Sequence, residues 1–232
     1  MPHDQPAVPP AGSRQTPADS SGMPLDHIMW AAPDLETGIA HFERLTGIRA
    51  TPGGRHPGRG THNALMSLEH GCYLEIIAPD PTQTLDNNLG AEIKALRAPG
   101  IFTYAVQCRD MNALVRAARQ AEIPLRGPEA WSREQPGGKT LEWLLAFTDE
   151  TPFGRYVPFY IDWKDSPHPS TTAARGLTLL DFTVMHPDRA RLAALYAALG
   201  IGVRVVAHDR PAMQAVLRGP RGDITLTAAS QE

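Results

Sequence analysis

The chain has 232 residues, of which 42% are hydrophobic and 20% are charged, and its formal net charge is −3. This size and balance are typical of one large or two small globular domains. The sequence has no basic block, which argues against a nucleic-acid-binding protein, and no apolar run approaches the roughly eighteen residues that would suggest a membrane span.

The N-terminus differs in composition from the rest of the chain. Residues 1–24 are rich in Pro, Ser, Gln and Asp and contain few aliphatic side chains, which predicts a disordered leader. They show neither the basic nor the apolar region of a signal peptide. Because Cys72 and Cys108 lie in apolar runs, we expect buried, reduced thiols in a cytoplasmic protein.

Order is expected to begin with a strand at residues 25–30, an apolar run with one histidine in it. Asp34 and Gly47 are typical of the residues that cap and end a helix, and they bracket an apolar stripe. A loop rich in Gly, Pro and Arg is expected next, at residues 52–60. Two strands joined by a short turn are then expected at 62–68 and 72–78.

The same order of elements recurs twice along the chain. The second and third sets are a strand at 101–108, a helix at 111–121, strands at 141–147 and 157–163, then a strand at 180–185, a helix at 191–199 and strands at 203–206, 212–217 and 224–227. The first and third sets also share letters, since "LDHIMWAAPD" starts at Leu25 and "LDFTVMHPD" starts at Leu180. This pattern predicts a repeated supersecondary unit. Such short units cannot bury good cores alone, so we expect them to pair.

We therefore expect three units after residue 24, the first two of them in one domain. Residues 25–170 are predicted to form one domain of two units, and residues 177–228 a third, degenerate unit. In this third unit Phe182 takes the place of His27, so we expect it to serve packing.

Two polar residues stand out on apolar strands. His27 shares its strand face with Leu25 and Met29, and Glu75 shares its face with Tyr73 and Ile77. An ionised carboxylate in such a place is costly without a cationic partner, and a divalent metal held by imidazole and carboxylate would satisfy both groups. The alternatives are a hydrogen-bonded core histidine and a glutamate that faces an arginine or solvent.

Several motifs together carry a family resemblance. They are "LDH" in the first strand, "GGRHPGRGTHNAL" in the loop and strand after it, "YLEII" in the last strand of the first unit, "VPFYIDW" in the second unit and "HP" at 168–169. In tandem β-α-β-β-β units, these motifs resemble the vicinal oxygen chelate superfamily, which includes glyoxalase I, extradiol dioxygenases, methylmalonyl-CoA epimerase and drug-resistance proteins. Within the superfamily, they are most similar to the glyoxalase-like domain branch.

The resemblance implies an α+β fold in which tandem βαβββ units form curved, cup-shaped mixed sheets with helices packed outside. It also implies a divalent metal ion (Zn, Fe, Mn or Ni) on the inner face, held by residues of the first and fourth strands of a unit. On this basis His27 and Glu75 are the expected ligands. The second unit offers no histidine or glutamate in the corresponding places, so His62 is considered as the third ligand, with His56 on the loop as the alternative.

Other polar and aromatic residues are candidates for binding a small-molecule substrate. They are Arg55, His56, Asn63, Arg133 and Trp143. The arginines could anchor a carboxylate or phosphate, although the loop before residue 61 could equally be a solvated turn and Trp143 ordinary core. Asp162 is a candidate general base or a partner of Arg133.

The leading expectation is a metal-dependent lyase, isomerase or dioxygenase acting on a small oxygen-rich molecule, with Glu75 and Asp162 as catalytic residues. The alternative is a metal-free protein that binds or sequesters a small molecule in the cup. A third alternative, a domain that only mediates assembly, leaves Glu75 unexplained. A homodimer is possible, since members of the superfamily often complete a cup by dimerising, whereas three units in one chain could also pair internally. Neither nucleic acid nor membrane is an expected partner.

Overall fold

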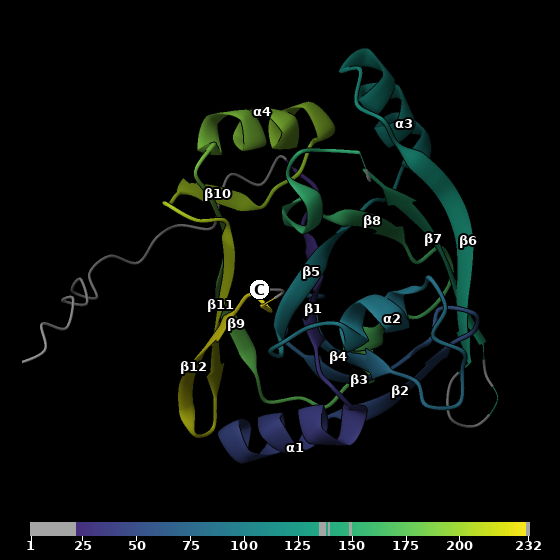
Figure 1. Cartoon of the computed structure of the whole chain (residues 1–232), viewed down its shortest axis with the longest axis vertical. Coiled ribbons are helices and arrows are strands. Elements are labelled where there is room, and N and C mark those ends of the chain that lie inside the picture. Colours follow the sequence, from purple (N-terminus) through teal and green to yellow (C-terminus); the bar gives the residue numbers. More distant parts are fainter. Residues whose placement is uncertain (1–21, 135–137, 139, 149, 231–232) are drawn as a thin grey trace, which may run out of the picture.

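The computed structural model describes residues 22–134, 138, 140–148 and 150–230 of the chain. It contains a closed eight-stranded barrel and a separate four-stranded sheet that lies against the outside of the barrel (Figure 1). Most of the predicted leader, residues 1–21, lies outside the described residues. No helix in the described part is long and apolar enough to cross a membrane.

The first half of the barrel is one β-α-β-β-β unit. Its elements are β1 (Leu25–Ala31), α1 (Leu35–Thr46), β2 (Thr51–His56), β3 (Thr61–Ser67) and β4 (Tyr73–Pro79). The ends of α1 are those predicted, because the Asp34 side chain accepts a hydrogen bond from the backbone N–H of Thr37 at 2.8 Å and Gly47 adopts the left-handed conformation with φ 77°. The helix buries Ile39 and Phe42 against the outer face of the barrel.

The second half repeats the order of the first. Its elements are β5 (Gly100–Gln107), α3 (Met111–Gln120), β6 (Arg126–Glu134), β7 (Thr140–Phe147) and β8 (Phe159–Asp162), and a short helix, α2 (Leu89–Lys94), connects the two halves. In each unit the first strand pairs in parallel with the last, β1 with β4 and β5 with β8. The two units are therefore alike in pairing as well as in order.

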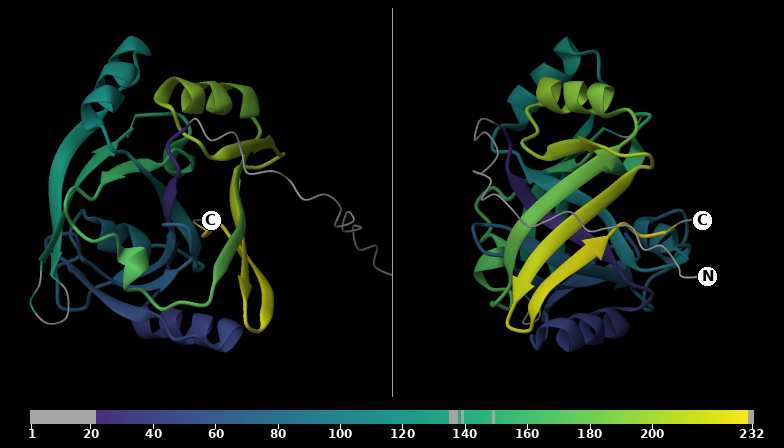
Figure 2. Two further views of the ribbon diagram at one scale, coloured as in Figure 1. Left: turned by 180° about the vertical axis from the view of Figure 1, so that it is seen from behind. Right: turned by 90° about the vertical axis from the view of Figure 1, so that its left-hand side faces the viewer.

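Two seams join the units into a barrel with the strand order β1-β4-β3-β2-β6-β7-β8-β5. Along one seam β1 pairs with β5 through six residue pairs, from Leu25–Val106 to Ala31–Gly100. Along the other seam, the described residues of β2 and β6 pair once, at Arg55 and Glu134. Helices α1 and α3 lie outside the barrel (Figures 1 and 2), and the expected α+β cup is confirmed. Helix α2 is the exception, because it lies within the outline of the barrel in Figure 1 and its Ile93 packs on the inner-face residues Met29 and Ile77.

The C-terminal segment forms its own sheet. Its elements are β9 (Thr178–His186), α4 (Arg189–Leu199), β10 (Arg204–Ala207), β11 (Ala212–Gly219) and β12 (Gly222–Thr227). The order of elements is that of the other units, but the pairing differs. Here β9 lies between β10 and β11, whereas β1 lies next to the last strand of its own unit. This sheet crosses the outside of the barrel, with α4 at one end and α1 at the other (Figure 2).

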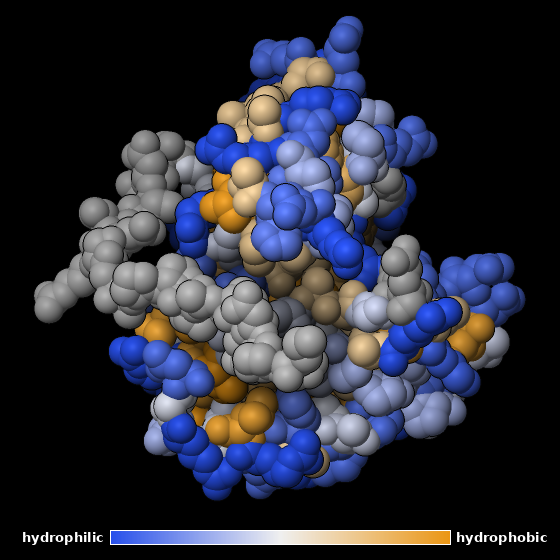
Figure 3. Space-filling model, turned by 60° about the vertical axis from the view of Figure 1, so that its left-hand side comes forward, coloured by the Kyte–Doolittle hydropathy of each residue, from blue (hydrophilic) through white to orange (hydrophobic). Residues whose placement is uncertain are grey.

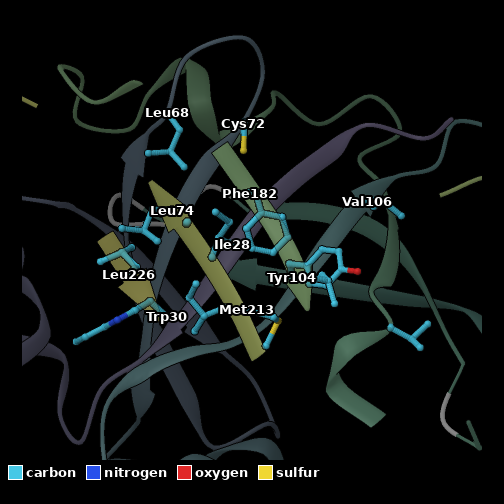
Figure 4. Close-up of a cluster of buried hydrophobic side chains, with 14 of the residues drawn as sticks. Ile28, Trp30, Leu68, Cys72, Leu74, Tyr104, Val106, Phe182, Met213 and Leu226 are labelled. Carbon is cyan, nitrogen blue, oxygen red and sulfur yellow. The ribbon is translucent and has the colours of Figure 1, made fainter. Parts of the chain in front are cut away.

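The main hydrophobic core lies between the barrel and the C-terminal sheet. Residues on the outer faces of β1, β4 and β5, such as Ile28, Leu74 and Tyr104, meet Phe182 and Met213 from the sheet (Figure 4). The rings of Tyr104 and Phe182 are 4.9 Å apart between centroids. A second hydrophobic cluster, which includes Trp143, lies inside the barrel.

Candidate functional site

The inside of the barrel contains a cavity of about 850 Å³. A cavity of this size fits a small organic molecule. Its walls come from both units, since His27 and Glu75 belong to the first unit and Arg133 and Trp143 to the second. On the molecular surface, hydrophilic residues cover the projecting parts while hydrophobic residues show mainly in the recesses between them (Figure 3).

The pairing of β1 with β4 brings the two predicted polar residues together. His27 lies beside Tyr73 in the register, and its ring stacks on that of Tyr73 with centroids 4.6 Å apart. Glu75 is two residues further along the same inner face, so its Oε2 lies 3.6 Å from Nε2 of His27. Both side chains are buried, with 3% of His27 and 5% of Glu75 exposed.

A β-bulge places a second acid beside His27. Leu25 pairs with Val106 and His27 with Ala105, so Asp26 is an extra residue in β1. Asp26 is fully buried, and its Oδ1 accepts a hydrogen bond from Nδ1 of His27 at 2.7 Å. Burial by itself raises the pKa of Asp26, but hydrogen bonds from His168 and His27 outweigh burial and hold this pKa below its ordinary value. The ionised carboxylate holds the N–H at Nδ1 of His27, so in the neutral ring Nε2 is the acceptor atom that faces Glu75.

The other carboxylate oxygen of Glu75 is held by an amide. Nδ2 of Asn63, on β3, donates to Oε1 of Glu75 at 2.6 Å. The amide oxygen of Asn63 in turn accepts a hydrogen bond from the Arg133 guanidinium, on β6, at 3.0 Å. A Cβ atom on Gly53 would lie 2.1 Å from the Asn63 oxygen and 2.6 Å from the guanidinium, so this link requires glycine on β2.

His56 completes the polar cluster as a neutral side chain. Its Nδ1 bonds to the Thr61 hydroxyl at 2.9 Å, and Nδ2 of Asn63 lies 3.4 Å from its Nε2. Since an amide nitrogen only donates, Nε2 carries a lone pair, and it lies 3.8 Å from Oε1 of Glu75. Burial lowers the pKa of His56 to about 4, against the opposing effect of Glu75.

Arg133 is a buried cation inside the barrel that has an unused hydrogen-bond donor within the described part of the chain. It is 2% exposed, and its Nε has no hydrogen-bond partner among the described residues. No carboxylate of the described chain lies within 4 Å of its guanidinium. A buried guanidinium of this kind can bind a carboxylate or an enolate oxygen with two parallel hydrogen bonds.

Aromatic rings form much of the remaining wall. Trp143 and Trp163 pack with centroids 5.1 Å apart, and the edge of Phe159 faces His27 at 5.3 Å. At the rim of the cavity, the guanidinium of Arg59 lies over Trp131 at 3.6 Å and that of Arg155 over Phe102 at 4.7 Å. These rings provide flat apolar surfaces around the polar cluster.

Six of the predicted site residues thus line one cavity. They are His27, His56, Asn63, Glu75, Arg133 and Trp143. His56, expected on a loop, is instead on β2, and β2 and β6 were both missed by the sequence prediction. The segment "TPGGRH" lacks the alternating apolar residues of a strand, and β2 forms because β3 and β6 pair with it.

Three predicted residues do not reach the cavity. His62 alternates with Asn63 along β3, and because Asn63 faces inward His62 faces outward. Arg55 alternates in the same way with His56 and forms an ion pair with Asp80 on the outside at 3.4 Å. Asp162 is opposite in face to Ile161 and accepts a hydrogen bond from the backbone N–H of Lys164 at 2.8 Å. These three side chains are therefore not in a position to contact a molecule bound in the cavity.

Two atoms near the end of Glu75 are of the kind that bind a divalent metal ion. His27 Nε2 and Glu75 Oε2 are two acceptors facing each other across 3.6 Å, and the proton of His27 lies on the far side of the ring. This arrangement suits a cation placed between them. Within the described ranges there is no group of three or more His, Cys, Asp or Glu side chains arranged to hold a metal.

The sequence reasoning missed Asp26, Trp163 and His168 as parts of the site. Nε1 of Trp163 donates to Oδ2 of Asp26 at 3.1 Å, and Nε2 of His168 lies 3.0 Å from the same oxygen. A signal was present in "LDH", where an acid directly precedes the histidine. Strict strand alternation would point Asp26 away from His27, and only the bulge reverses this.

The chain was compared with solved structures. A hypothetical protein from Staphylococcus aureus has a TM-score of 0.61 at 15% identity, covering 89% of this chain and 85% of that one, and this likeness concerns the fold alone. Methylmalonyl-CoA epimerase from Mycobacterium tuberculosis gives 0.43 at 20% identity, covering 62% of this chain and 89% of that one. A variant of the Streptomyces coelicolor epimerase in complex with 2-nitronate-propionyl-CoA gives 0.41 at 18% identity, covering 61% of this chain and 96% of that one.

No curated protein matches the chain. The family model described as "Glyoxalase-like domain" matches residues 25–200, which include the whole barrel and the first part of the C-terminal sheet. The chain is therefore a member of the glyoxalase-like domain family.

Proposed function

We propose that the protein is an enzyme that binds a small oxygen-rich anion inside the barrel and transfers a proton at a carbon next to its carbonyl group. The observation that carries this proposal is the placement of Glu75, whose Oε1 is held by Asn63 while Oε2 faces the cavity near His27. A fixed carboxylate beside a buried guanidinium combines a base with an anion anchor.

Each residue has a separate part in the proposed reaction. Arg133 binds the carboxylate or the carbonyl oxygen of the substrate, and its positive charge stabilises the enolate that forms there. Glu75 takes the proton from the adjacent carbon through Oε2. It then returns the proton to a neighbouring carbon or oxygen, which gives an isomerase, or a leaving group departs from the enolate, which gives a lyase.

The proposal includes a divalent metal ion, with Zn, Fe, Mn and Ni as the candidates. His27 Nε2 would hold it, with Glu75 as a second ligand only while its Oε2 is not acting as the base, and it would polarise a substrate oxygen as a Lewis acid. The hydrogen bond from His27 to Asp26 supports this assignment, because metal-binding histidines commonly donate their other ring N–H to a carboxylate.

The first experiment identifies a ligand and then measures proton transfer. The full chain is screened by thermal shift against α-keto acids, α-keto aldehydes, catechols and acyl-CoA compounds, with EDTA and with each metal, since a ligand stabilises the folded state that binds it. Each compound that stabilises the protein is then incubated in D₂O, and the exchange of its carbon-bound protons is followed by NMR.

Two variants make this experiment decisive. Glu75→Gln keeps the volume of the side chain and its ability to form hydrogen bonds, but it removes the base. We therefore expect the rate of proton exchange to fall about 10²- to 10⁴-fold, while the thermal shift caused by the ligand is largely retained. Asp162→Asn changes a carboxylate outside the cavity and should exchange at the wild-type rate. Exchange that survives unchanged in Glu75→Gln would contradict the proposal.

The aromatic wall supports a second candidate, a metal-free binding or sequestering protein. Trp143, Trp163 and Phe159 offer ring faces for stacking a ligand without any chemical step. A compound that stabilises the protein strongly in EDTA, and whose protons do not exchange, would favour this candidate over the enzyme.

A further inference from the structure

We propose that His168, on the linker between the barrel and the C-terminal sheet, is a positioning residue that clamps Asp26 and thereby fixes the tautomer of His27. Its importance for catalysis rests on the proposed function, in which Nε2 of His27 must present a lone pair to the cavity. His168 itself lies outside the cavity, since it borders a separate surface pocket of about 610 Å³ together with His70 and Arg109.

The carboxylate of Asp26 is the centre of this arrangement. It is fully buried and faces three ring N–H groups, from His27, His168 and Trp163. His27 occupies Oδ1 at 2.7 Å, and His168 and Trp163 bond to Oδ2 at 3.0 and 3.1 Å. With both oxygens occupied, the carboxylate cannot turn away from His27 without leaving a buried N–H unpaired.

The proton on His168 can be located from its other neighbours. The backbone N–H of Ser170 points at Nδ1 of His168 at 3.3 Å, and the Ser170 hydroxyl bonds to the same atom at 2.7 Å. A backbone N–H only donates, so Nδ1 is an acceptor and the ring proton is on Nε2. His168 therefore donates to Asp26.

This assignment separates positioning from proton relay. Asp26 receives an N–H from each histidine, and Nε2 of His168 already carries a proton, so it has no lone pair with which to accept one from Asp26. The set acts as a clamp that orients one imidazole, as the outer partners of functional histidines commonly do. Without the donor of His168, Oδ2 of Asp26 keeps only the bond from Trp163, so the carboxylate is held less firmly in its orientation toward His27.

The tautomer of His27 can be measured directly. The full-length chain is labelled with ring-¹⁵N histidine, kept in EDTA at a pH at which neutral imidazole dominates, and studied by long-range ¹⁵N–¹H spectra. The His27 signals are assigned from their loss in His27→Gln. We expect the wild type to show His27 protonated at Nδ1 alone.

Three variants then test the clamp. In His168→Met, which keeps side-chain volume but has no donor, we expect the Nε2-protonated form of His27 to become populated. His168→Gln can place an amide N–H where Nε2 was and should restore the Nδ1–H form. His70→Asn changes a histidine of the same outer pocket that has no bond to Asp26 and should leave the spectrum unchanged.

Every outcome bears on the proposal. An unchanged His27 spectrum in His168→Met would overturn it, as would a change in His168→Met that His168→Gln does not reverse. If His168→Met does not fold, Ser170→Ala takes its place, because without the Ser170 hydroxyl the His168 ring loses its 2.7 Å partner and the same shift in His27 is expected to a smaller extent.

The readout is independent of catalysis. If no compound shows proton exchange, the proposed function fails while the tautomer result stands. If exchange is found, we expect His168→Met to lower kcat about 10- to 100-fold with little change in KM, and His168→Gln to recover most of this loss.

Discussion

Asn63 links the two charged residues of the polar cluster. Its amide donates to Glu75 and accepts from Arg133, so one side chain joins the proposed base to the proposed anion anchor. Leucine could fill a similar volume but would leave both charged groups without this partner inside the barrel. The contact also explains why residue 53 is glycine, since no side chain fits beside the amide.

His56 provides a test at the residue scale. Because burial lowers its pKa to about 4, the unfolded chain binds a proton at higher pH than the folded chain does. Its contribution to stability is therefore fully present above about pH 6.5 and is lost as the pH falls toward 4, by about 3 kcal/mol in total. Urea unfolding of wild type and His56→Gln in EDTA, at pH 7.5 and pH 4.5, measures this difference.

The His56→Gln variant should lose less stability than the wild type over this interval. His208→Gln, on the exposed loop after β10, is the matched control and should follow the wild type. Equal pH dependence in wild type and His56→Gln would mean that His56 is not held neutral by burial.

Alternation along strands explains which residues could be predicted. His27 and Glu75 were found because each is a polar residue on an apolar strand face, and the structure brings them together. The same rule applied to Asn63 and His62 shows that only one of them can face inward, and the sequence does not say which. Asp26 could not be predicted, because the bulge in β1 depends on the pairing with β5.

At the scale of elements, the three longer helices and the apolar strands were predicted within a few residues, whereas the short helix α2 was not predicted. The strands β2 and β6 were missed because they contain Gly, Pro and charged residues and form only when their partners are in place. These two strands carry His56 and Arg133, so the parts of the site that were hardest to derive lie on the elements with the weakest local signal. The C-terminal sheet shows the converse, since its order of elements was correct but its pairing differs from the repeat.

The cap of α1 gives a prediction at this scale. Asp34 accepts hydrogen bonds from both the hydroxyl and the backbone N–H of Thr37, and these lower the pKa of Asp34 despite some burial. Asp34→Ala should lower the free energy of unfolding by about 1 kcal/mol at pH 7. Because the pKa is lowered in the folded state, this contribution is lost as the pH falls through the acidic range.

Urea unfolding at pH 7 and pH 3 measures this contribution. Asp209→Ala removes an exposed aspartate for which the structure gives no capping bond, and it should leave stability within about 0.5 kcal/mol of the wild type. A cost for Asp34→Ala that stays the same at pH 3 would show that the cap does not depend on the ionised carboxylate.

At the scale of the whole molecule, the barrel and the C-terminal sheet share one hydrophobic core. Residues of β1, β4 and β5 pack directly on β9, β11 and β12. Because neither side of this core is covered without the other, we expect the two parts to unfold together in one transition.

Phe182 tests this shared core. Its ring packs on Tyr104 and it is 9% exposed, so Phe182→Ala should cost about 3 kcal/mol. Leu180→Ala, on the same strand but 42% exposed, should cost less than about 1 kcal/mol. Urea unfolding followed by tryptophan fluorescence, which reports the barrel, and by far-UV circular dichroism should give coincident curves for both variants. Separate transitions would show that the sheet folds independently.

The unequal seams of the barrel have a consequence for ligand binding. The six residue pairs between β1 and β5 hold one side firmly, while the described residues of β2 and β6 meet at a single pair on the other. Arg133 and Glu75 belong to the two sides of that short seam. A molecule that contacts both residues therefore links the two halves, and its binding stabilises the closed barrel against opening at this seam.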